Sequence, residues 1–237
     1  MSSDDAARPR PDISLFYPMY NEEANVDEAV ETALSVLARL ARRYEVILVN
    51  DGSRDRTGEL ADAWTKRRPE VRAVHHDRNR GYGAGLQSGI RAARYDWVFY
   101  TDGDNQFVLD DLERMLPLRD ERTIVTGYRE ARNDPWHRKL NASIYNLAIR
   151  VLFGLRLRDV DCAFKLYPPG LFADMPLVSN GAVIDVEILA RARRAGYRFR
   201  EMPVHHRPRR HGEQSGANLK VILRAFRELG RLWLELR

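Results

Sequence analysis

The chain has 237 residues, of which 44% are apolar, so it can bury a sizeable core and does not have the composition of a disordered protein. Its single cysteine excludes a disulfide framework, and no stretch approaches about 18 uncharged apolar residues, so we expect no membrane-spanning helix. The net charge of +5 is unevenly spread: residues 136–158 hold five basic and no acidic residues, and residues 198–237 hold ten basic and four acidic ones.

The first half of the chain alternates between predicted strands and predicted helices with short connections. Apolar runs predict strands over residues 12–18, 45–53, 71–76 and 96–104. Apolar residues spaced three or four apart predict helices over residues 26–43, 55–68 and 83–94. This alternation is typical of parallel β-α-β units, so we expect an α/β protein with a mostly parallel central sheet in a three-layer α/β/α sandwich.

The second half is less regular, and its helices are amphipathic. Strands are predicted over residues 123–130, 163–168 and 198–206, and helices over residues 136–154, 181–196 and from about 217 onward. The polar start lacks the apolar segment of a signal peptide. We therefore expect three parts: a flexible leader over residues 1–11, one domain over residues 12–216, and an amphipathic basic helix over residues 217–237.

Three polar side chains follow the fourth predicted strand at alternate positions: Asp102, Asp104 and Gln106. If the backbone stays extended there, the three side chains point to one side of the chain. Two neighbouring carboxylates repel each other unless a cation lies between them. Because all the donors are hard oxygens, the spacing favours Mg²⁺ or Mn²⁺, although an Asp-Gly turn without a metal would also fit.

Acidic and amide side chains also follow the other predicted strands. They are Asn21, Glu22, Asp51, Asp77 and Asn79. Because the carboxyl ends of parallel strands meet at one edge of a sheet, these groups predict a nucleotide site there. The glycine-rich stretch "RGYGAGLQSG" lacks the third glycine of a dinucleotide-binding fingerprint and follows the third strand, so we do not expect NAD-type binding.

A resemblance to a known family emerges from six stretches in order: "YPMYNEEANV", "VNDGSRDRT", "NRGYGAGLQSGI", "TDGDNQF", "VDCAFKLY" and "VHHRPRRHGEQSG". Together they resemble family 2 glycosyltransferases of the GT-A fold, and within that family the polyprenyl-phosphate sugar transferases of the dolichol-phosphate mannosyltransferase type. The match runs from about Asp12 to about Gly216. It implies the GT-A fold, with the amphipathic helices after the catalytic core.

The resemblance also implies roles for particular residues. Asp102-Gly103-Asp104 takes the place of the Asp-x-Asp metal motif, and Gln106 the place of a further ligand. Pro18, Tyr20 and Glu22 match the first nucleotide-binding loop, and Asp51 matches the acid that contacts base or ribose. Arg129 and Arg209 resemble arginines that contact donor phosphates or acceptor. The spacing after Arg209 is one residue longer than in the family motif, so Ser215 receives no role.

Candidate general bases are Asp185 and Glu187, near the start of a predicted helix, where acids are favoured in any case. A hydroxyl acceptor would require such a base. A lipid phosphate would not, because its oxygen is already ionised near neutral pH, and arginines that bind the phosphate would matter more.

The basic segments bear on the acceptor. Lys220, Arg224, Arg227 and Arg231 form one cationic face of the last predicted helix, opposite an apolar face. Such helices suit an anionic membrane surface, although they could also pack on the core with their arginines in water. No basic motif is interleaved with aromatic residues, so we do not expect nucleic-acid binding.

The sequence therefore predicts an inverting, metal-dependent transferase at the cytoplasmic membrane face, moving a sugar from a UDP- or GDP-sugar to polyprenyl phosphate, with a possible membrane-protein partner. Two alternatives stay open. One keeps the donor but passes the sugar to a hydroxyl of a glycan, protein or small molecule. The other is a non-catalytic protein that binds nucleotide sugars or lipids.

Overall fold

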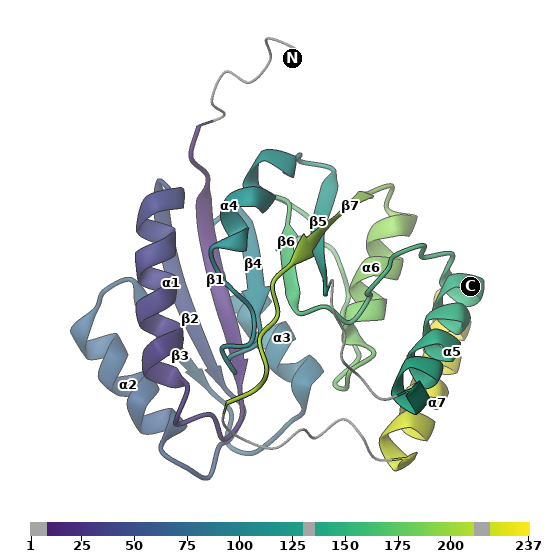
Figure 1. The fold of residues 1–237 in the computed structure, drawn as a ribbon, viewed down its shortest axis with the longest axis horizontal. Helices are drawn as coiled ribbons and strands as arrows, with labels where there is room; N and C mark the ends of the chain where they lie inside the picture. The colour runs from purple at the N-terminus through teal and green to yellow at the C-terminus, as the bar shows by residue number, and fades with distance from the viewer. Residues whose placement is uncertain (1–8, 130–135, 211–218) are drawn as a thin grey trace.

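The computed structural model describes residues 9–129, 136–210 and 219–237, arranged around a seven-stranded sheet (Figure 1). The strands are β1 (Asp12–Met19), β2 (Arg43–Asn50), β3 (Val71–His75), β4 (Trp97–Thr101), β5 (Thr123–Arg129), β6 (Phe164–Tyr167) and β7 (Arg198–Val204). Their order in the sheet is β3-β2-β1-β4-β6-β5-β7. The mostly parallel sheet predicted from the sequence is confirmed.

The helices are α1 (Val26–Leu40), α2 (Thr57–Arg67), α3 (Tyr82–Ala92), α4 (Asp111–Met115), α5 (Trp136–Phe153), α6 (Ile184–Arg194) and α7 (Leu219–Glu235). All the predicted helices are present within a few residues of their expected ends. The sequence pattern did not predict α4, whose single turn is too short for a periodic signal and continues into a 3-10 turn at Leu116–Leu118.

One strand runs against its neighbours, and this reversal shapes the sheet edge. β1 pairs in parallel with β2 and β4, whereas β6 lies antiparallel between β4 and β5. A reversed strand begins at the edge where its neighbours end. The residues just before β6 therefore lie at the same edge of the sheet as those that follow β4.

The sheet separates two hydrophobic clusters, because successive side chains of a strand point to opposite faces. On β1, Leu15 faces the cluster that includes α1, α2 and α4, whereas Phe16 faces the cluster that includes α3 and α6. Helices therefore cover both faces of the sheet, and the predicted three-layer α/β/α architecture is confirmed.

Helices α5 and α7 lie side by side at one end of the molecule (Figure 1). The Tyr145 and Phe226 rings make an edge-to-face contact at 5.8 Å, and Leu229 and Leu232 of α7 are buried in the second cluster. Leu147 and Val151 of α5 are exposed. Across the described ranges, no helix has the length and hydropathy needed to cross a bilayer.

Candidate active site

The chain turns directly after β4, so the expectation of extended backbone through Gln106 is wrong. β4 ends at Thr101, residues 103–105 form a turn or bend, and Asn105 adopts a left-handed φ of +57°. The carboxylate of Asp104 accepts a hydrogen bond from the backbone N–H of Gln106 at 3.2 Å. The turn, rather than strand alternation, determines how the two aspartates lie.

The glycine between the two aspartates is required by close packing on β1. A Cβ atom on Gly103 would lie 2.7 Å from Cγ of the buried Met19 and 3.4 Å from the carbonyl oxygen of Pro18. No side chain fits there without displacing the core. Gly103 thus contributes space rather than a ligand, and it brings the turn against the end of β1.

The carboxylate of Asp102 lies in an environment that disfavours its charge. Burial, followed by the negative charges of Asp104 and Asp185, raises the pKa of Asp102 to about 7. The Tyr82 hydroxyl donates a hydrogen bond to Oδ1 of Asp102 at 3.1 Å. A divalent cation between Asp102 and Asp104 would remove the repulsion, because it favours the ionised form of both acids.

The donor set fits Mg²⁺ or Mn²⁺ bound together with a diphosphate. Throughout the described residues, no group of three or more His, Cys, Asp or Glu side chains forms a closed metal site. Mg²⁺ is commonly bound by one or two carboxylates together with substrate phosphates and water. Two aspartates are therefore sufficient on the protein side.

Gln106 is held by the segment that follows β7. The side-chain amide of Gln106 donates to the backbone carbonyl of Arg207 at 2.9 Å, and the backbone carbonyl of Gln106 accepts from the Arg207 N–H at 2.7 Å. The next residues, Phe107 and His206, form an antiparallel bridge. The role of Gln106 as a metal ligand stays a prediction. These contacts hold residues 205–207 against the turn that carries the two aspartates.

The same segment carries Arg209 to the first loop. The Arg209 guanidinium forms an ion pair with Glu22, which also accepts a hydrogen bond from Asn25 Nδ2 at 2.5 Å. Burial raises the pKa of Glu22, and the charge of Asp104 adds to this shift, while Asn25 and Arg209 oppose it. These effects place Glu22, Asp104 and Arg209 in one electrostatic neighbourhood, and their predicted contacts with donor or acceptor stay predictions.

The other residues of the first loop frame this neighbourhood. Pro18 lies at the end of β1, and Tyr20 beyond it is 39% exposed. Asn21 has a left-handed φ of +56°, its N–H donates to Ser53, and its side-chain oxygen accepts from the Arg54 N–H. The loops after β1 and β2 are therefore tied together before any ligand binds.

Asp51 is occupied by donors from this chain. Its Oδ1 bonds with His76 Nδ1 at 2.6 Å and with the Arg80 N–H at 2.8 Å, and its Oδ2 accepts from the Gly81 N–H at 2.9 Å. These bonds shape the loop after β3, on which Asp77 and Asn79 are exposed. The predicted nucleotide contacts of Asp51, Asp77 and Asn79 stay predictions.

Arg129 lies at the end of β5 and pairs with a carboxylate from the segment before β6. Its Nε and one terminal nitrogen donate to the two oxygens of Asp159 at 2.7 and 2.9 Å. Burial acts to lower the pKa of Arg129, but the hydrogen bonds and charge of Asp159 outweigh it and hold that pKa above its usual range. The reversal of β6 makes this pairing possible.

The two candidate bases are both buried and bonded. Asp185 accepts hydrogen bonds from Lys165 Nζ at 2.7 Å and from the Tyr100 hydroxyl. Glu187 accepts from the backbone N–H groups of residues 178 and 179 and from Arg191 Nε at 2.9 Å. Through these contacts, Glu187 anchors the loop before α6, and Asp185 pairs with the buried Lys165.

Sequence reasoning missed several residues that organise this edge: His76, Tyr82, Asp159 and Lys165. Lys165 carried a signal, because a lysine inside the apolar strand "FKLY" must find a buried partner. Tyr82 carried a weaker signal, as a large residue between two glycines. His76 and Asp159 carried none, because their partners lie far away in the sequence.

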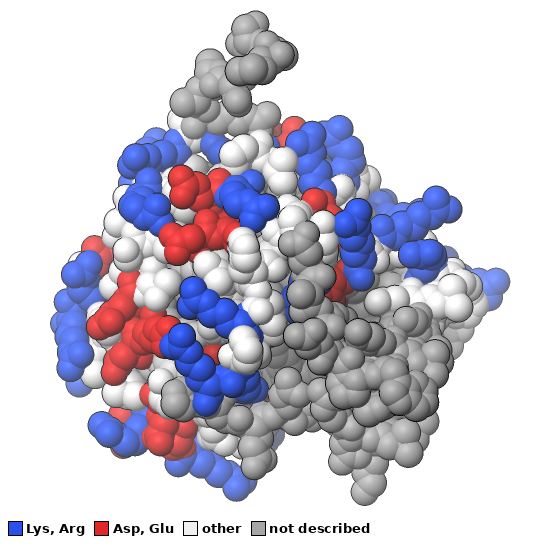
Figure 2. Space-filling model, in the orientation of Figure 1, with Lys and Arg blue, Asp and Glu red and all other residues white. Residues whose placement is uncertain are grey.

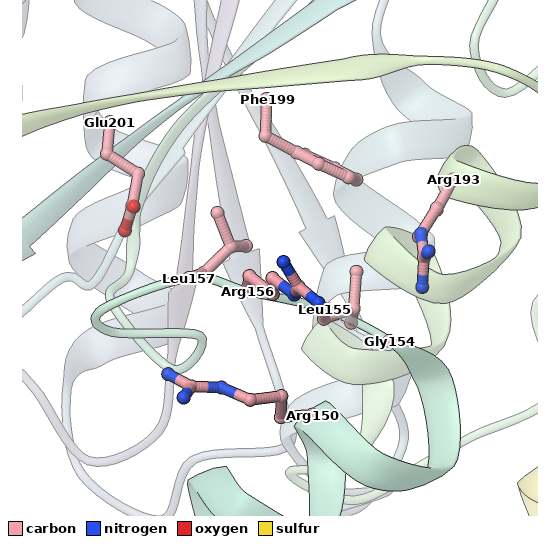
Figure 3. Close-up of a pocket in the computed structure, with 8 residues that line it drawn as sticks. All are labelled: Arg150, Gly154, Leu155, Arg156, Leu157, Arg193, Phe199 and Glu201. Atoms are coloured by element: carbon pink, nitrogen blue, oxygen red, sulfur yellow. The ribbon is translucent and has the colours of Figure 1, made fainter.

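Two pockets lie at separate places around the sheet. A pocket of about 60 Å³ opens beside Asp102 and is lined by Thr101, Asn105, Phe107 and Arg207 among others. A larger pocket of about 690 Å³ lies between the end of α5, the end of α6 and β7. Figure 3 shows Arg150, Arg156 and Arg193 around it, with Leu157 and Phe199 on its walls. The two pockets share no lining residue.

The comparisons with known proteins agree with this geometry. The family model described as "Glycosyl transferase family 2" matches residues 14–174. The undecaprenyl-phosphate 4-deoxy-4-formamido-L-arabinose transferase of Edwardsiella ictaluri is 29% identical over 212 residues, covering 89% of this chain and 64% of that protein. Its counterpart in Pseudomonas fluorescens is 30% identical over 216 residues, covering 90% and 62%.

Another relative is glycosyltransferase AglD of Haloferax volcanii, 29% identical over 235 residues, covering 95% of this chain and 37% of that protein. The chain thus spans less than two thirds of the length of these curated relatives. Two crystal structures of glucosyl-3-phosphoglycerate synthase from Mycobacterium tuberculosis share the fold. The complex with phosphoglyceric acid has a TM-score of 0.68 at 21% identity, covering 95% of this chain and 80% of that one.

The complex with Mn²⁺, UDP and phosphoglyceric acid has a TM-score of 0.69 at 19% identity, covering 95% and 78%. Together with the family model, these likenesses confirm the GT-A fold and the resemblance to polyprenyl-phosphate sugar transferases. The chain belongs to glycosyl transferase family 2.

Proposed function

We propose that this chain transfers a sugar from UDP- or GDP-sugar to polyprenyl phosphate, with a divalent metal and with inversion at the sugar carbon. The observation that carries the proposal is the paired aspartates 102 and 104, whose repulsion calls for a cation, beside the Glu22–Arg209 ion pair. The relatives named as undecaprenyl-phosphate sugar transferases support the acceptor.

The donor half of the reaction requires stabilisation of a departing nucleoside diphosphate. Asp102 and Asp104 would hold Mg²⁺ or Mn²⁺, which when bound stabilises the negative charge that develops on the diphosphate. Arg209 supplies further positive charge on the same side, provided that its guanidinium turns from Glu22 toward the phosphates. The loops after β1 and β2, tied through Asn21, Ser53 and Arg54, present the nucleotide-binding positions Pro18, Tyr20 and Asp51.

The acceptor half needs no general base. A phosphate oxygen of the lipid is already ionised, so it attacks the sugar carbon directly from the face opposite the leaving group. The bond from sugar carbon to donor phosphate breaks, its electron pair leaves with the nucleoside diphosphate, and no proton moves. This agrees with the buried, fully bonded state of Glu187 and the Lys165 ion pair of Asp185.

The membrane surface in this proposal is formed by α5 and α7. Leu147, Val151, Phe226 and Leu234 are exposed apolar residues of these helices, and Arg227 and Arg231 are exposed cations of α7. Apolar side chains flanked by cations suit the headgroup region of an anionic bilayer. Lys220 and Arg224 of the predicted cationic face lie outside the described side chains.

The remaining parts of the proposal follow from the same assignment. The transferase unit would span residues 12–216 and its membrane-facing helix residues 217–237, after a leader over residues 1–11. Residues 1–8, 130–135 and 211–218 of these parts lie outside the described residues. The membrane face would be the cytoplasmic one, where nucleotide sugars are made available, and a membrane protein could receive the glycosylated lipid.

The test is a transfer assay with the whole chain, labelled UDP- and GDP-sugars, polyprenyl phosphate, and Mg²⁺ or Mn²⁺. We expect metal-dependent appearance of label in the lipid phase with one donor, and about 10³-fold slower transfer with Asp104→Asn. Label in a glycan or small-molecule hydroxyl instead would favour the alternative acceptor. No transfer with any donor, despite donor binding, would favour a binding protein.

A further inference from the structure

The hydroxyl of Tyr82 lies near both Asp102 and Tyr100. Neither the proposed chemistry nor the comparisons assigns this residue a role. Its hydroxyl donates to Oδ1 of Asp102 at 3.1 Å. Within the described residues, no other side-chain donor to this carboxylate is present. Among the described side chains, the Tyr82 hydroxyl is thus the group that orients the carboxylate of Asp102 by a hydrogen bond.

The backbone on both sides of Tyr82 is held closely. Gly81, which precedes it, has a φ of +97° and donates its N–H to Asp51. Gly83, which follows it, donates its N–H to the Asn180 carbonyl at 2.9 Å, and a Cβ there would lie 2.4 Å from the carbonyl oxygen of Ser179. The start of α3 is thus fixed in place, and the ring of Tyr82 with it.

The hydroxyl of Tyr82 has a second neighbour, the hydroxyl of Tyr100. Tyr100 donates to Asp185, and its oxygen accepts from Lys165 Nζ at 3.1 Å. The carboxylate of Asp102 is then the stronger acceptor for the Tyr82 proton, because hydrogen bonds to ionised groups are stronger than those between neutral ones. The buried Lys165–Asp185 pair binds the Tyr100 hydroxyl and in this way favours the hydrogen bond from Tyr82 to Asp102.

We propose that Tyr82 is a positioning residue for the divalent cation: its hydroxyl holds Oδ1 of Asp102 and leaves Oδ2 to the metal. Hydrogen bonds from outside a metal's direct ligands orient those ligands and raise affinity. The inference rests on the metal assigned under the proposed function. It adds a determinant of metal affinity that does not itself touch metal or substrate.

The experiment is a titration of the whole chain with Mn²⁺ alone, followed by electron paramagnetic resonance, and again with UDP or GDP present. Tyr82→Phe removes the hydroxyl and keeps the ring. The matched control is Tyr17→Phe, because Tyr17 is also a buried tyrosine with one hydroxyl hydrogen bond, donated to the Ala29 carbonyl at 3.3 Å. Thermal unfolding of each variant is measured in parallel.

We expect Tyr82→Phe to weaken Mn²⁺ binding by about tenfold, the lower part of the range for such outer contacts, while Tyr17→Phe keeps the affinity of the unchanged chain. A lower melting temperature for Tyr82→Phe with an unchanged Kd would mean a purely structural role and would overturn the inference. If the unchanged chain binds no Mn²⁺ with or without nucleotide, the metal assignment itself fails. If the unchanged chain and Tyr82→Phe bind Mn²⁺ equally, the metal assignment stands and only the role of Tyr82 fails.

Discussion

The edge that follows β1–β4 and the region of α5, α6 and α7 differ in how their charges are held. At the first, carboxylates such as Asp51 and Asp102 are bonded to backbone N–H groups and hydroxyls of neighbouring loops. In the second, many arginines project from helix surfaces, and Figure 2 shows mostly basic side chains near α6 and the start of β7. The first is a preorganised site, whereas the second is a charged surface.

This difference matters because preorganisation and surface charge act on different quantities. Fixed groups in a partly buried site stabilise charge that develops in a transition state. Exposed cations mainly raise affinity for an anionic surface, and salt screens them. A substitution in the first region should therefore leave affinity for an anionic membrane unchanged, and a substitution in the second should leave the stabilisation of the transition state unchanged.

The largest effect is expected at the paired aspartates. Asp104→Asn removes one of the proposed metal ligands, and we expect transfer to fall by about 10³-fold, because charge on the leaving diphosphate is no longer stabilised. Binding to anionic vesicles should be unchanged. Asp62→Asn, an exposed aspartate on α2, is the control, and equal activities of the two variants would contradict the assignment.

Arg209 belongs to the first region, and its loss should have the next largest effect. Arg209→Gln breaks the ion pair with Glu22 and removes a cation beside Asp104, so we expect kcat to fall by about 10²-fold. The control is Arg210→Gln, because Arg210 is the adjacent, exposed arginine. If both variants lose vesicle binding and keep kcat, Arg209 belongs with the surface charges instead.

The surface of α7 is tested by Arg227→Gln/Arg231→Gln. Each basic residue near an anionic membrane contributes about 1 kcal/mol, so the double variant should bind phosphatidylglycerol vesicles about 30-fold more weakly at low salt. Mn²⁺ binding should not change. Lys66→Gln/Arg67→Gln removes the same charge from exposed positions of α2, and a similar loss there would mean that net charge alone attracts the membrane.

The smallest effect concerns pH and lies far from both regions. Arg42 and Arg43 hydrogen-bond Asp12 and hold its pKa well below the usual range. Since the folded-state pKa is depressed, this stabilisation is complete above the unfolded pKa of about 3.9 and is lost as pH falls through the folded value.

We therefore expect Asp12→Asn to destabilise the chain by less than about 1 kcal/mol at pH 7, and by a smaller amount at pH 3. Urea unfolding at both pH values measures this, with the exposed Asp174→Asn as control. A destabilisation that is the same at both pH values would show that the carboxylate charge is not responsible.

Much of the fold could be predicted because the chain signals it locally. The strands are continuous apolar runs and the longer helices have three-to-four periodicity, so both appear near their predicted positions. The direction of β6 could not be predicted, because "FKLY" reads the same in either orientation. Its reversal depends on which neighbours it pairs with, which is a long-range property.

The site was predictable in its residue types and less so in its geometry. Asp102 and Asp104 stood out as acids after an apolar strand, but the turn between them depends on packing against Met19. The partners of Asp51, Arg129 and Asp185 lie between 20 and 85 positions away in the sequence. Such pairings have no local pattern, so the sequence shows the charged side chain but not the groups that hydrogen-bond to it.

The tight contact between Gly103 and Met19 has a consequence for how this protein can vary. A side chain added at position 103 alone meets Met19 across the sheet edge, whereas a smaller residue at position 19 would make room for an alanine at position 103. These two positions should therefore change together in descendants of this chain, and a library randomised at both should recover pairs of complementary volume that single-site libraries miss.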